Sequence, residues 1–217
     1  MSVITVERKV LEKNDLIASE IRKSFLDKKI FSINLVSSPG SGKTSLVERT
    51  LANNKSNLNI AVVEGDVQTD LDAKRVDAFG VPVVQIVTNG ACHLEAGLVR
   101  DALKSLELNS VNLLIIENVG NLVCPAGYDL GEDLKVVVAS TTEGDDKPLK
   151  YPAMFRNSSA LIINKIDLLP YLNCDLEALK KNALTINPTL KIFEVSCTTD
   201  AGINDWIEWL EQKIKTK

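Results

Sequence analysis

The sequence lacks several features that would assign it to a special class of protein. Only four of its 217 residues are cysteine, one is histidine, and 5% are aromatic. It contains no run of about 18 apolar residues, the length that a membrane-spanning helix needs. Its first residues lack the charged-then-apolar order of a signal peptide. We therefore expect a cytoplasmic protein without a membrane partner, whose cysteines are thiols or metal ligands rather than disulfides.

An excess of charge of one sign is also missing. The chain has 25 basic and 29 acidic residues, a formal net charge of −4, which gives no electrostatic reason to expect nucleic acid as a partner. With 45% apolar and 25% charged residues, the composition is that of an ordinary globular protein. A chain of this length buries roughly 70% of its unfolded surface, so folding requires neither a disulfide nor a structural metal.

Short apolar runs alternate with helical patterns along the chain. Apolar residues at spacings of four and seven predict an amphipathic helix over 5–27. The apolar runs are 31–37, 58–64, 81–87, 112–117, 134–140, 160–164 and 191–196. Further helices are predicted over 43–54, 70–79, 91–107, 175–186 and 203–215. Most runs are apolar on both faces, which is typical of parallel strands covered by helices. The alternation predicts an α/β fold, a doubly wound and mostly parallel sheet of about seven strands. No repeat or linker divides the chain, so we expect residues 1–217 to form one domain.

A phosphate-binding loop is predicted directly after the first run. Glycines in such a strand-to-helix turn let successive backbone N–H groups point at phosphate. Lys43 would reach the β- and γ-phosphates, and the Thr44 hydroxyl would bind Mg²⁺. Ser37 departs from the motif, which begins with glycine. The nucleotide-binding candidates here are Pro39, Gly40, Ser41, Gly42, Lys43, Thr44 and Ser45.

Guanine is the base that the sequence favours. Asn164-Lys165-Ile166-Asp167 follows the sixth run. The Asp167 carboxylate can accept hydrogen bonds from guanine N1–H and the 2-amino group, whereas adenine offers no such pair. The Lys165 stem would pack over the base, and Asn164 would tie this loop to the phosphate loop. Ser196-Cys197, after the last run, falls where GTPases place a backbone N–H against the guanine oxygen, with Cys197 as a neutral small residue. The sequence thus predicts a P-loop protein that binds GTP and GDP.

The switch elements are less standard. Glu117 and Gly120 stand where GTPases carry Asp-x-x-Gly, so Glu117 would hold the Mg²⁺ shell and the Gly120 N–H would contact the γ-phosphate. Asp66 is the first choice for a second Mg²⁺-linked carboxylate and Asp72 the second choice, although either could instead cap a helix. Asn121 replaces the water-orienting glutamine of several GTPases, and no arginine finger is evident, so we expect slow hydrolysis. The catalytic candidates are Lys43, Thr44, Asp66, Glu117 and Gly120, and the magnesium ligands are Thr44, Asp66 and Glu117.

A second set of residues suggests a transition metal. Cys92 and His93 follow the third run, and Cys124 lies four residues beyond Gly120. Thiolate and imidazole are ligands for Zn²⁺ and Ni²⁺, although such a pair can also be incidental. Adjacent residues diverge by about 100° on a helix, so both could bind only at an irregular helix start. A fourth ligand would come from water or from a second subunit.

Longer motifs carry a resemblance to a known family. They are Ser-Ser-Pro-Gly-Ser-Gly-Lys-Thr at 37–44, Glu-Gly-Asp at 64–66, Cys-His-Leu-Glu-Ala at 92–96, Ile-Glu-Asn-Val-Gly-Asn-Leu-Val-Cys-Pro at 116–125, Ser-Thr-Thr-Glu-Gly-Asp-Asp at 140–146 and Asn-Lys-Ile-Asp at 164–167. Through them, nearly the whole chain resembles the HypB-type nickel-incorporation GTPases of [NiFe]-hydrogenase maturation. These are SIMIBI-class P-loop proteins related to the urease accessory GTPase UreG.

The resemblance implies a metal site, a dimer and partners. Cys92, His93 and Cys124 would bind nickel or zinc, and GTP would favour a homodimer. A HypA-type zinc-binding chaperone would exchange nickel with the chain, and the hydrogenase large-subunit precursor would receive it directly or indirectly. Neither an N-terminal Cys-x-x-Cys-Gly-Cys site nor a histidine-rich stretch is present, so high-affinity nickel storage is not expected.

Three alternatives remain open at this point. A UreG-type protein would carry Cys-Pro-His as one tripeptide, whereas Cys124-Pro125 continues to Ala126. A GTP-dependent binding switch would use its cysteines only structurally. An ATP-driven partitioning or transport ATPase is opposed by Asn164–Asp167 and by the absence of an extra lysine near the start of the phosphate loop.

Overall fold

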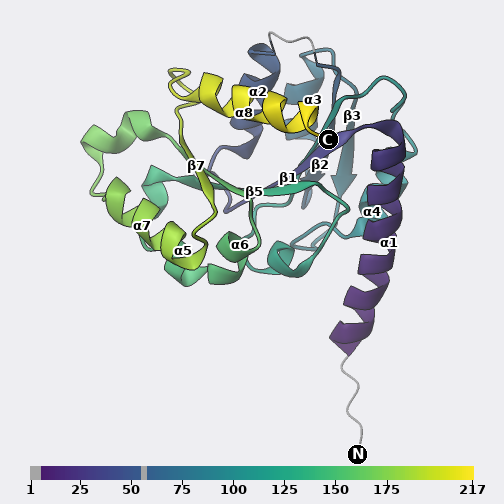
Figure 1. The fold of residues 1–217 in the computed structure, drawn as a ribbon, viewed down its shortest axis with the longest axis horizontal. Helices are drawn as coiled ribbons and strands as arrows, with labels where there is room; N and C mark the ends of the chain where they lie inside the picture. Colours follow the sequence, from purple (N-terminus) through teal and green to yellow (C-terminus); the bar gives the residue numbers. More distant parts are fainter. Residues whose placement is uncertain (1–5, 55–57) are drawn as a thin grey trace, which may run out of the picture.

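The described residues build one parallel sheet with helices on both faces (Figure 1). The computed structural model describes residues 6–54 and 58–217, with side chains from residue 10. Its seven strands lie in the order β3-β2-β4-β1-β5-β6-β7, and every neighbouring pair is parallel. The strands are β1 (Phe31–Ser37), β2 (Ile60–Asp66), β3 (Val83–Val87), β4 (Leu113–Glu117), β5 (Leu134–Ser140), β6 (Ala160–Asn164) and β7 (Lys191–Glu194). The predicted doubly wound α/β fold is confirmed.

Helices connect these strands in the predicted places, with two differences. They are α1 (Val6–Lys28), α2 (Lys43–Ala52), α3 (Leu71–Asp77), α4 (Ala96–Leu103), α5 (Lys147–Lys150), α6 (Pro152–Arg156), α7 (Leu176–Ile186) and α8 (Ile203–Lys215), with 3₁₀ turns η1 (Cys124–Gly127), η2 (Thr141–Glu143) and η3 (Ile166–Tyr171). The helix predicted over 91–107 begins only at Ala96, so its predicted start was wrong by a full turn. The short α5 and α6 were not predicted. Residue 5 of the predicted first helix, and the first residues judged for a signal peptide, lie outside the described residues.

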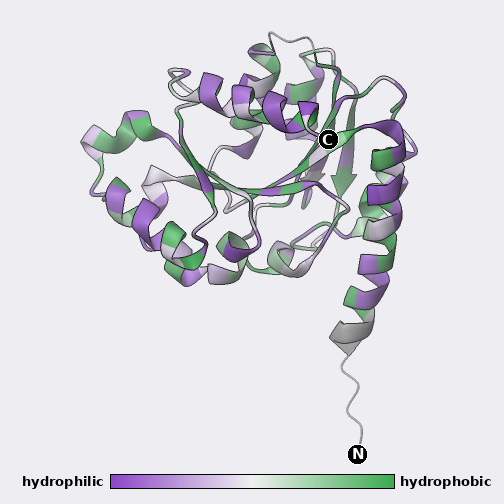
Figure 2. Ribbon diagram, in the orientation of Figure 1, coloured by the Kyte–Doolittle hydropathy of each residue, from purple (hydrophilic) through white to green (hydrophobic). Residues whose placement is uncertain are grey.

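Two helical layers bury the two faces of each strand. Helices α2, α3 and α8 share a core with side chains such as Leu35, while Val36, the next residue of the same strand, belongs to a core with α6 and α7. Helices α1 and α4 cover the same face as α6 and α7, over β2 and β4. The helices carry both hydrophobic and hydrophilic residues in Figure 2, as expected for elements with one buried side.

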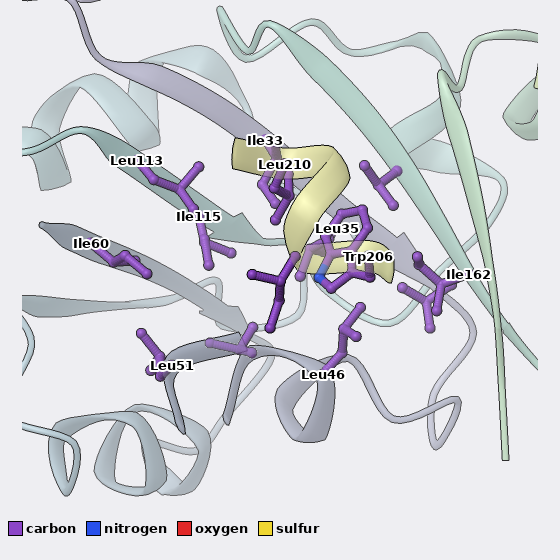
Figure 3. Close-up of a cluster of buried hydrophobic side chains, with 14 of the residues drawn as sticks. Ile33, Leu35, Leu46, Leu51, Ile60, Leu113, Ile115, Ile162, Trp206 and Leu210 are labelled. Atoms are coloured by element: carbon purple, nitrogen blue, oxygen red, sulfur yellow. The ribbon is translucent and has the colours of Figure 1, made fainter. Parts of the chain in front are cut away.

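Trp206 of α8 is the largest fully buried side chain of the first core (Figure 3). It packs among residues of the central strands and α2, and its indole N–H donates to Thr50 Oγ1 at 3.1 Å. Because burying a large apolar side chain contributes about 1.5–3 kcal/mol, this layer fixes α2 firmly beneath the phosphate loop. No helix within the described residues is long and apolar enough to cross a membrane.

Candidate functional site

The phosphate loop closes tightly over the start of α2. Gly40 and Gly42 have φ angles of 75° and 95°, in the left-handed region that favours glycine. A Cβ at Gly42 would collide with the Asn164 side chain. Ser41 is fully buried and donates through its hydroxyl to Ser38 O at 2.9 Å and to Glu143 Oε1 at 2.5 Å. The carboxylate of Glu143, which was not among the predicted site residues, therefore holds this loop from the end of β5.

Lys43 and Thr44 project toward a buried carboxylate. The Lys43 ammonium donates to Ser37 Oγ at 3.0 Å and lies 3.9 Å from Glu117 Oε1. The Thr44 hydroxyl donates to the same Glu117 oxygen at 2.9 Å. Ser37, the departure from the glycine motif, thus contacts the catalytic lysine candidate directly.

A second carboxylate, Glu64, lies beside Glu117. The two residues are register partners at the ends of β2 and β4, and both are almost fully buried. Burial, together with the negative charge of Glu117, raises the pKa of Glu64 to about 10. Burial also raises the pKa of Glu117, to about 7, although Lys43 and Thr44 oppose the shift. One buried oxygen of each carboxylate accepts no hydrogen bond within the described part of the chain. The unsatisfied Glu117 oxygen, beside the Thr44 hydroxyl at the cavity wall, fits a hard divalent cation such as Mg²⁺.

The cavity in front of these groups has a volume of about 550 Å³. Asp66 lies on its rim, and its Oδ1 accepts hydrogen bonds from the backbone N–H groups of Gln68 and Thr69 at 2.9 and 2.7 Å. Asp70 is the residue that precedes the first turn of α3, so the alternative that Asp66 or Asp72 caps this helix is wrong. Asp66 and Asp72 both line the cavity.

An arginine that the sequence did not single out also lines the cavity. The Arg75 guanidinium donates to both carboxylate oxygens of Glu48, at 2.9 and 2.7 Å, and to Asp72 at 3.2 Å. It reaches Ser45 Oγ at 3.3 Å. Arg75 therefore ties α3 to α2 rather than projecting freely toward the phosphate loop.

The Asn164–Asp167 loop meets the phosphate loop through two hydrogen bonds. Asn164 donates to Ser41 O at 2.9 Å, and the Lys165 ammonium donates to Gly40 O at 2.7 Å. Lys165 itself has a φ of 64°, which lifts its side chain toward the cavity.

Asp167 is oriented from the next loop. Its Oδ1 accepts the Ser196 hydroxyl at 2.6 Å, and the backbone N–H of Cys197 donates to Asn164 Oδ1 at 3.3 Å. Burial raises the pKa of the Cys197 thiol to about 11, so this side chain is neutral at physiological pH. The geometry brings together every residue predicted for the base.

Gly120 joins this nucleotide cavity to the second cluster. A Cβ at this position would lie 3.1 Å from both Cα and N of Pro39, so only glycine fits without displacing the phosphate loop. Four residues further on, η1 begins at Cys124.

The predicted metal ligands lie together. One ligand atom from each of Cys92, His93 and Cys124 lies within 4.8 Å of the others. Cys92 Sγ donates to Cys124 Sγ at 2.9 Å and lies 3.7 Å from His93 Nδ1. Because α4 begins only at Ala96, the adjacent Cys92 and His93 stand in irregular backbone and can face one point, as the sequence required. Two thiols and an imidazole are a donor set for soft or borderline cations such as Ni²⁺ and Zn²⁺.

The surroundings of His93 keep it in a form that binds metal. Burial lowers the pKa of the imidazole, which favours the neutral ring. The ring lies 4.0 Å from that of Tyr128, centroid to centroid, and Nε2 lies 3.8 Å from Glu95 Oε1. The Tyr128 ring packs against the imidazole, and Nε2 is buried without a hydrogen-bond partner within the described residues.

Known proteins are similar to this chain in sequence and in fold. The family model described as "CobW/HypB/UreG, nucleotide-binding domain" matches residues 31–194. The "Hydrogenase maturation factor HypB" of Escherichia coli strain K12 is 49% identical over 209 residues, 96% of this chain and 72% of that protein. The "Hydrogenase/urease maturation factor HypB" of Helicobacter hepaticus is 42% identical, over 97% of this chain and 88% of that protein.

A solved structure, HypB from Helicobacter pylori in complex with nickel, superimposes with a TM-score of 0.90 at 40% identity. The match covers 94% of this chain and 96% of that one. The sequence, the sheet and the phosphate loop thus lead to one assignment: the chain belongs to the CobW/HypB/UreG family of nucleotide-binding proteins, on its HypB branch.

Proposed function

We propose that this chain binds GTP and Mg²⁺, hydrolyses GTP slowly to GDP, and carries nickel as cargo for [NiFe]-hydrogenase maturation. The observation that supports it best is the segment from Gly120, packed on Pro39 of the phosphate loop, to Cys124 of the metal cluster. The names of the E. coli and H. pylori relatives, and the nickel of the latter, support hydrogenase as the target and nickel as the cargo. Residues 1–217 would act as one G domain, since their described part forms a single sheet.

The nucleotide would be held by the groups already paired around the cavity. Backbone N–H groups of the phosphate loop and the Lys43 ammonium would bind the phosphates, while Asp167 and the Cys197 N–H would bind guanine. Thr44, Glu117 and Asp66 would hold Mg²⁺, which supplies charge neutralisation at the β- and γ-phosphates. The Asn121 carboxamide is hydrogen-bonded to Cys92 O and to the N–H of Val123, and these bonds compete with a role in orienting the hydrolytic water, which supports slow hydrolysis.

Nickel would be bound by Cys92, His93 and Cys124. Three protein ligands leave a four-coordinate ion one short, so a second copy of the chain or water would complete the site. A GTP-promoted homodimer is the form we propose, because a second copy would supply the missing ligand and the Cys124 loop continues directly from the Gly120 segment at the phosphate loop. A HypA-type zinc-binding chaperone would exchange nickel with the chain, on the way to the hydrogenase large-subunit precursor.

Two alternatives predict different results. The name of the H. hepaticus relative supports nickel delivery to urease. The chain would then use the same metal site, and urease would receive the nickel. A GTP-dependent switch with purely structural cysteines would hold no nickel at the cluster.

Nickel affinity is expected to differ between the GDP-bound and GTP-bound protein. If the Gly120 N–H contacts the γ-phosphate, the segment 120–124 has two arrangements and Cys124 moves with it. By linkage, nickel must then change the affinity for nucleotide by the same factor, about 5- to 150-fold for a typical coupling. Nickel titrations in the presence of GDP and of a non-hydrolysable GTP analogue measure it. Equal nickel affinities, in protein that dimerises with the analogue, would disprove the coupling.

Gly120→Ala is expected to reduce the preference for the GTP analogue over GDP by about tenfold. The added Cβ must move away from Pro39 by a few tenths of an ångström, which withdraws the Gly120 N–H from the γ-phosphate position. A hydrogen bond to a charged group contributes about 1.5–3 kcal/mol, and GDP lacks that phosphate. Gly127→Ala, in η1, meets nothing within 4 Å and is the matched control. Loss of GDP affinity to the same extent would instead indicate general damage to the phosphate loop.

A further inference from the structure

Two asparagines join the loop that carries Cys92 and His93 to the loop that carries Cys124. Asn118 Oδ1 accepts the backbone N–H of Leu94 at 3.1 Å. Asn121 Nδ2 donates to the carbonyl of Cys92 at 3.3 Å, while its Oδ1 accepts the N–H of Val123 at 2.8 Å. The two side chains therefore hold the main-chain groups on both sides of His93.

The Asn118 side chain is itself oriented by a buried chain of polar groups. Its Nδ2 donates to Asn34 Oδ1 at 3.2 Å, and Asn34 Nδ2 donates to Glu132 Oε1 at 3.1 Å. Lys135 lies 3.8 Å from that carboxylate and donates to Pro125 O, the carbonyl next to Cys124, at 3.0 Å. All four residues are at most 8% exposed. The chain of contacts thus runs beneath the cluster from the Cys92–His93 loop to Cys124.

Burial of these polar groups costs free energy, which suggests that the arrangement serves a function. Burying amide and charged groups costs free energy unless each is hydrogen-bonded, and apolar clusters lie on this face of the sheet. Outer partners that orient metal ligands are typically worth 10- to 100-fold in metal affinity. Here the bonds go to the backbone of residues 92–94, where the ligands stand in irregular structure that no helical hydrogen bonding maintains.

We propose that Asn118 and Asn121 are positioning residues of the metal cluster. They do not bind the metal themselves. They set the distance and orientation of the Cys92–His93 loop relative to Cys124. The inference rests on the proposed function, in that the cluster must bind nickel. It adds that nickel geometry depends on two carboxamides of the nucleotide-sensing segment.

The test uses the full chain with GDP bound and Ni²⁺ as the probe. Asn121→Ala removes a partly exposed side chain and leaves the buried core intact, whereas Asn118→Leu keeps the branching at Cγ but removes the hydrogen bonds at a buried position. Asn59→Ala is the matched control, because Asn59 Nδ2 likewise bridges two segments, to Ser110 O at 2.8 Å, at the opposite ends of the strands. Nickel affinity, the nickel–thiolate charge-transfer absorbance and GDP affinity are measured for each variant.

We expect nickel affinity to fall about three- to tenfold in Asn121→Ala and about 10- to 100-fold in Asn118→Leu. The charge-transfer band should shift in both variants. GDP affinity is expected to stay at the parental value in Asn121→Ala and in Asn59→Ala, and the GDP control rests on these two variants because Asn118 lines the nucleotide cavity. An unshifted band and parental nickel affinity in Asn121→Ala would overturn the inference, whether or not Asn118→Leu folds. If Cys92→Ser binds nickel as tightly as the parent, the proposed metal site is wrong. That result is distinct from failure of the positioning role of Asn118 and Asn121.

Discussion

Nickel binding is expected to disappear in the double variant Cys92→Ser plus Cys124→Ser. The two Sγ atoms lie 2.9 Å apart and, with His93, form the one group of metal-ligand side chains found among the described residues. Serine hydroxyls are neutral and hard, so they do not replace thiolates toward Ni²⁺. Because residues that merely orient ligands are worth about 10- to 100-fold, the loss of two ligands should exceed about 100-fold. Metal analysis after gel filtration, together with calorimetric nickel titration, measures the effect.

The same variant should leave nucleotide binding intact. Neither cysteine lines the 550 Å³ cavity, so GDP affinity is expected to stay within about twofold of the parent. Cys174→Ser is the matched control, since this free thiol lies outside the cluster. Unchanged nickel content in the double variant would favour the alternative in which the cysteines are structural.

The central strands were predictable because β1, β2, β4, β5 and β6 are buried along nearly their whole length. The predicted bounds of β1, β5 and β6 match the observed strands at both ends. The strands β2 and β3 each begin two residues later than predicted. The start of α4 was not predictable from local pattern. Its first amides bind distant side chains, Leu94 N to Asn118 and Ala96 N to Asn14 of α1, so the chain at 91–95 follows tertiary contacts instead of helical hydrogen bonding.

The candidate site also contains residues that the sequence could identify and residues that depend on tertiary contacts. Residues placed at the carboxyl ends of strands, such as Lys43, Asp167 and Cys92, could be named from the sequence because parallel strands bring those ends together. Glu64 also ends an apolar run, and pairing the ends of β2 and β4 would have placed it beside Glu117. Glu132 could not be found this way, since its contact with Asn34 depends on the β1–β5 register and on the turn before β5.

Asp167→Asn is expected to lower GDP affinity by at least about 100-fold. The carboxylate accepts from both N1–H and the 2-amino group of guanine, and each hydrogen bond to a charged group is worth about 1.5–3 kcal/mol. An amide keeps one acceptor but turns an N–H₂ donor toward the 2-amino group, so two donors face each other. Ser196→Ala removes the 2.6 Å bond that orients Asp167, together with the two bonds that Ser196 Oγ accepts from the N–H groups of Thr198 and Thr199, but it keeps the carboxylate and should cause a smaller loss.

Xanthine nucleotides test whether Asp167 selects the base, because the Asp167→Asn variant should prefer xanthine to guanine. Xanthine has a carbonyl where guanine has the 2-amino group, so the amide of the Asp167→Asn variant can donate to it while the amide oxygen still accepts N1–H. Competition of GDP, XDP and ADP should therefore show a reversed order for the variant, with XDP above GDP. Asp205→Asn, an exposed carboxylate of α8, should bind GDP as the parent does. If Asp167→Asn leaves GDP affinity unchanged, or if ADP competes equally with GDP in the parent, then this loop does not select guanine. That result would favour the ATPase alternative, because the phosphate loop contacts only the phosphates, which adenine and guanine nucleotides share.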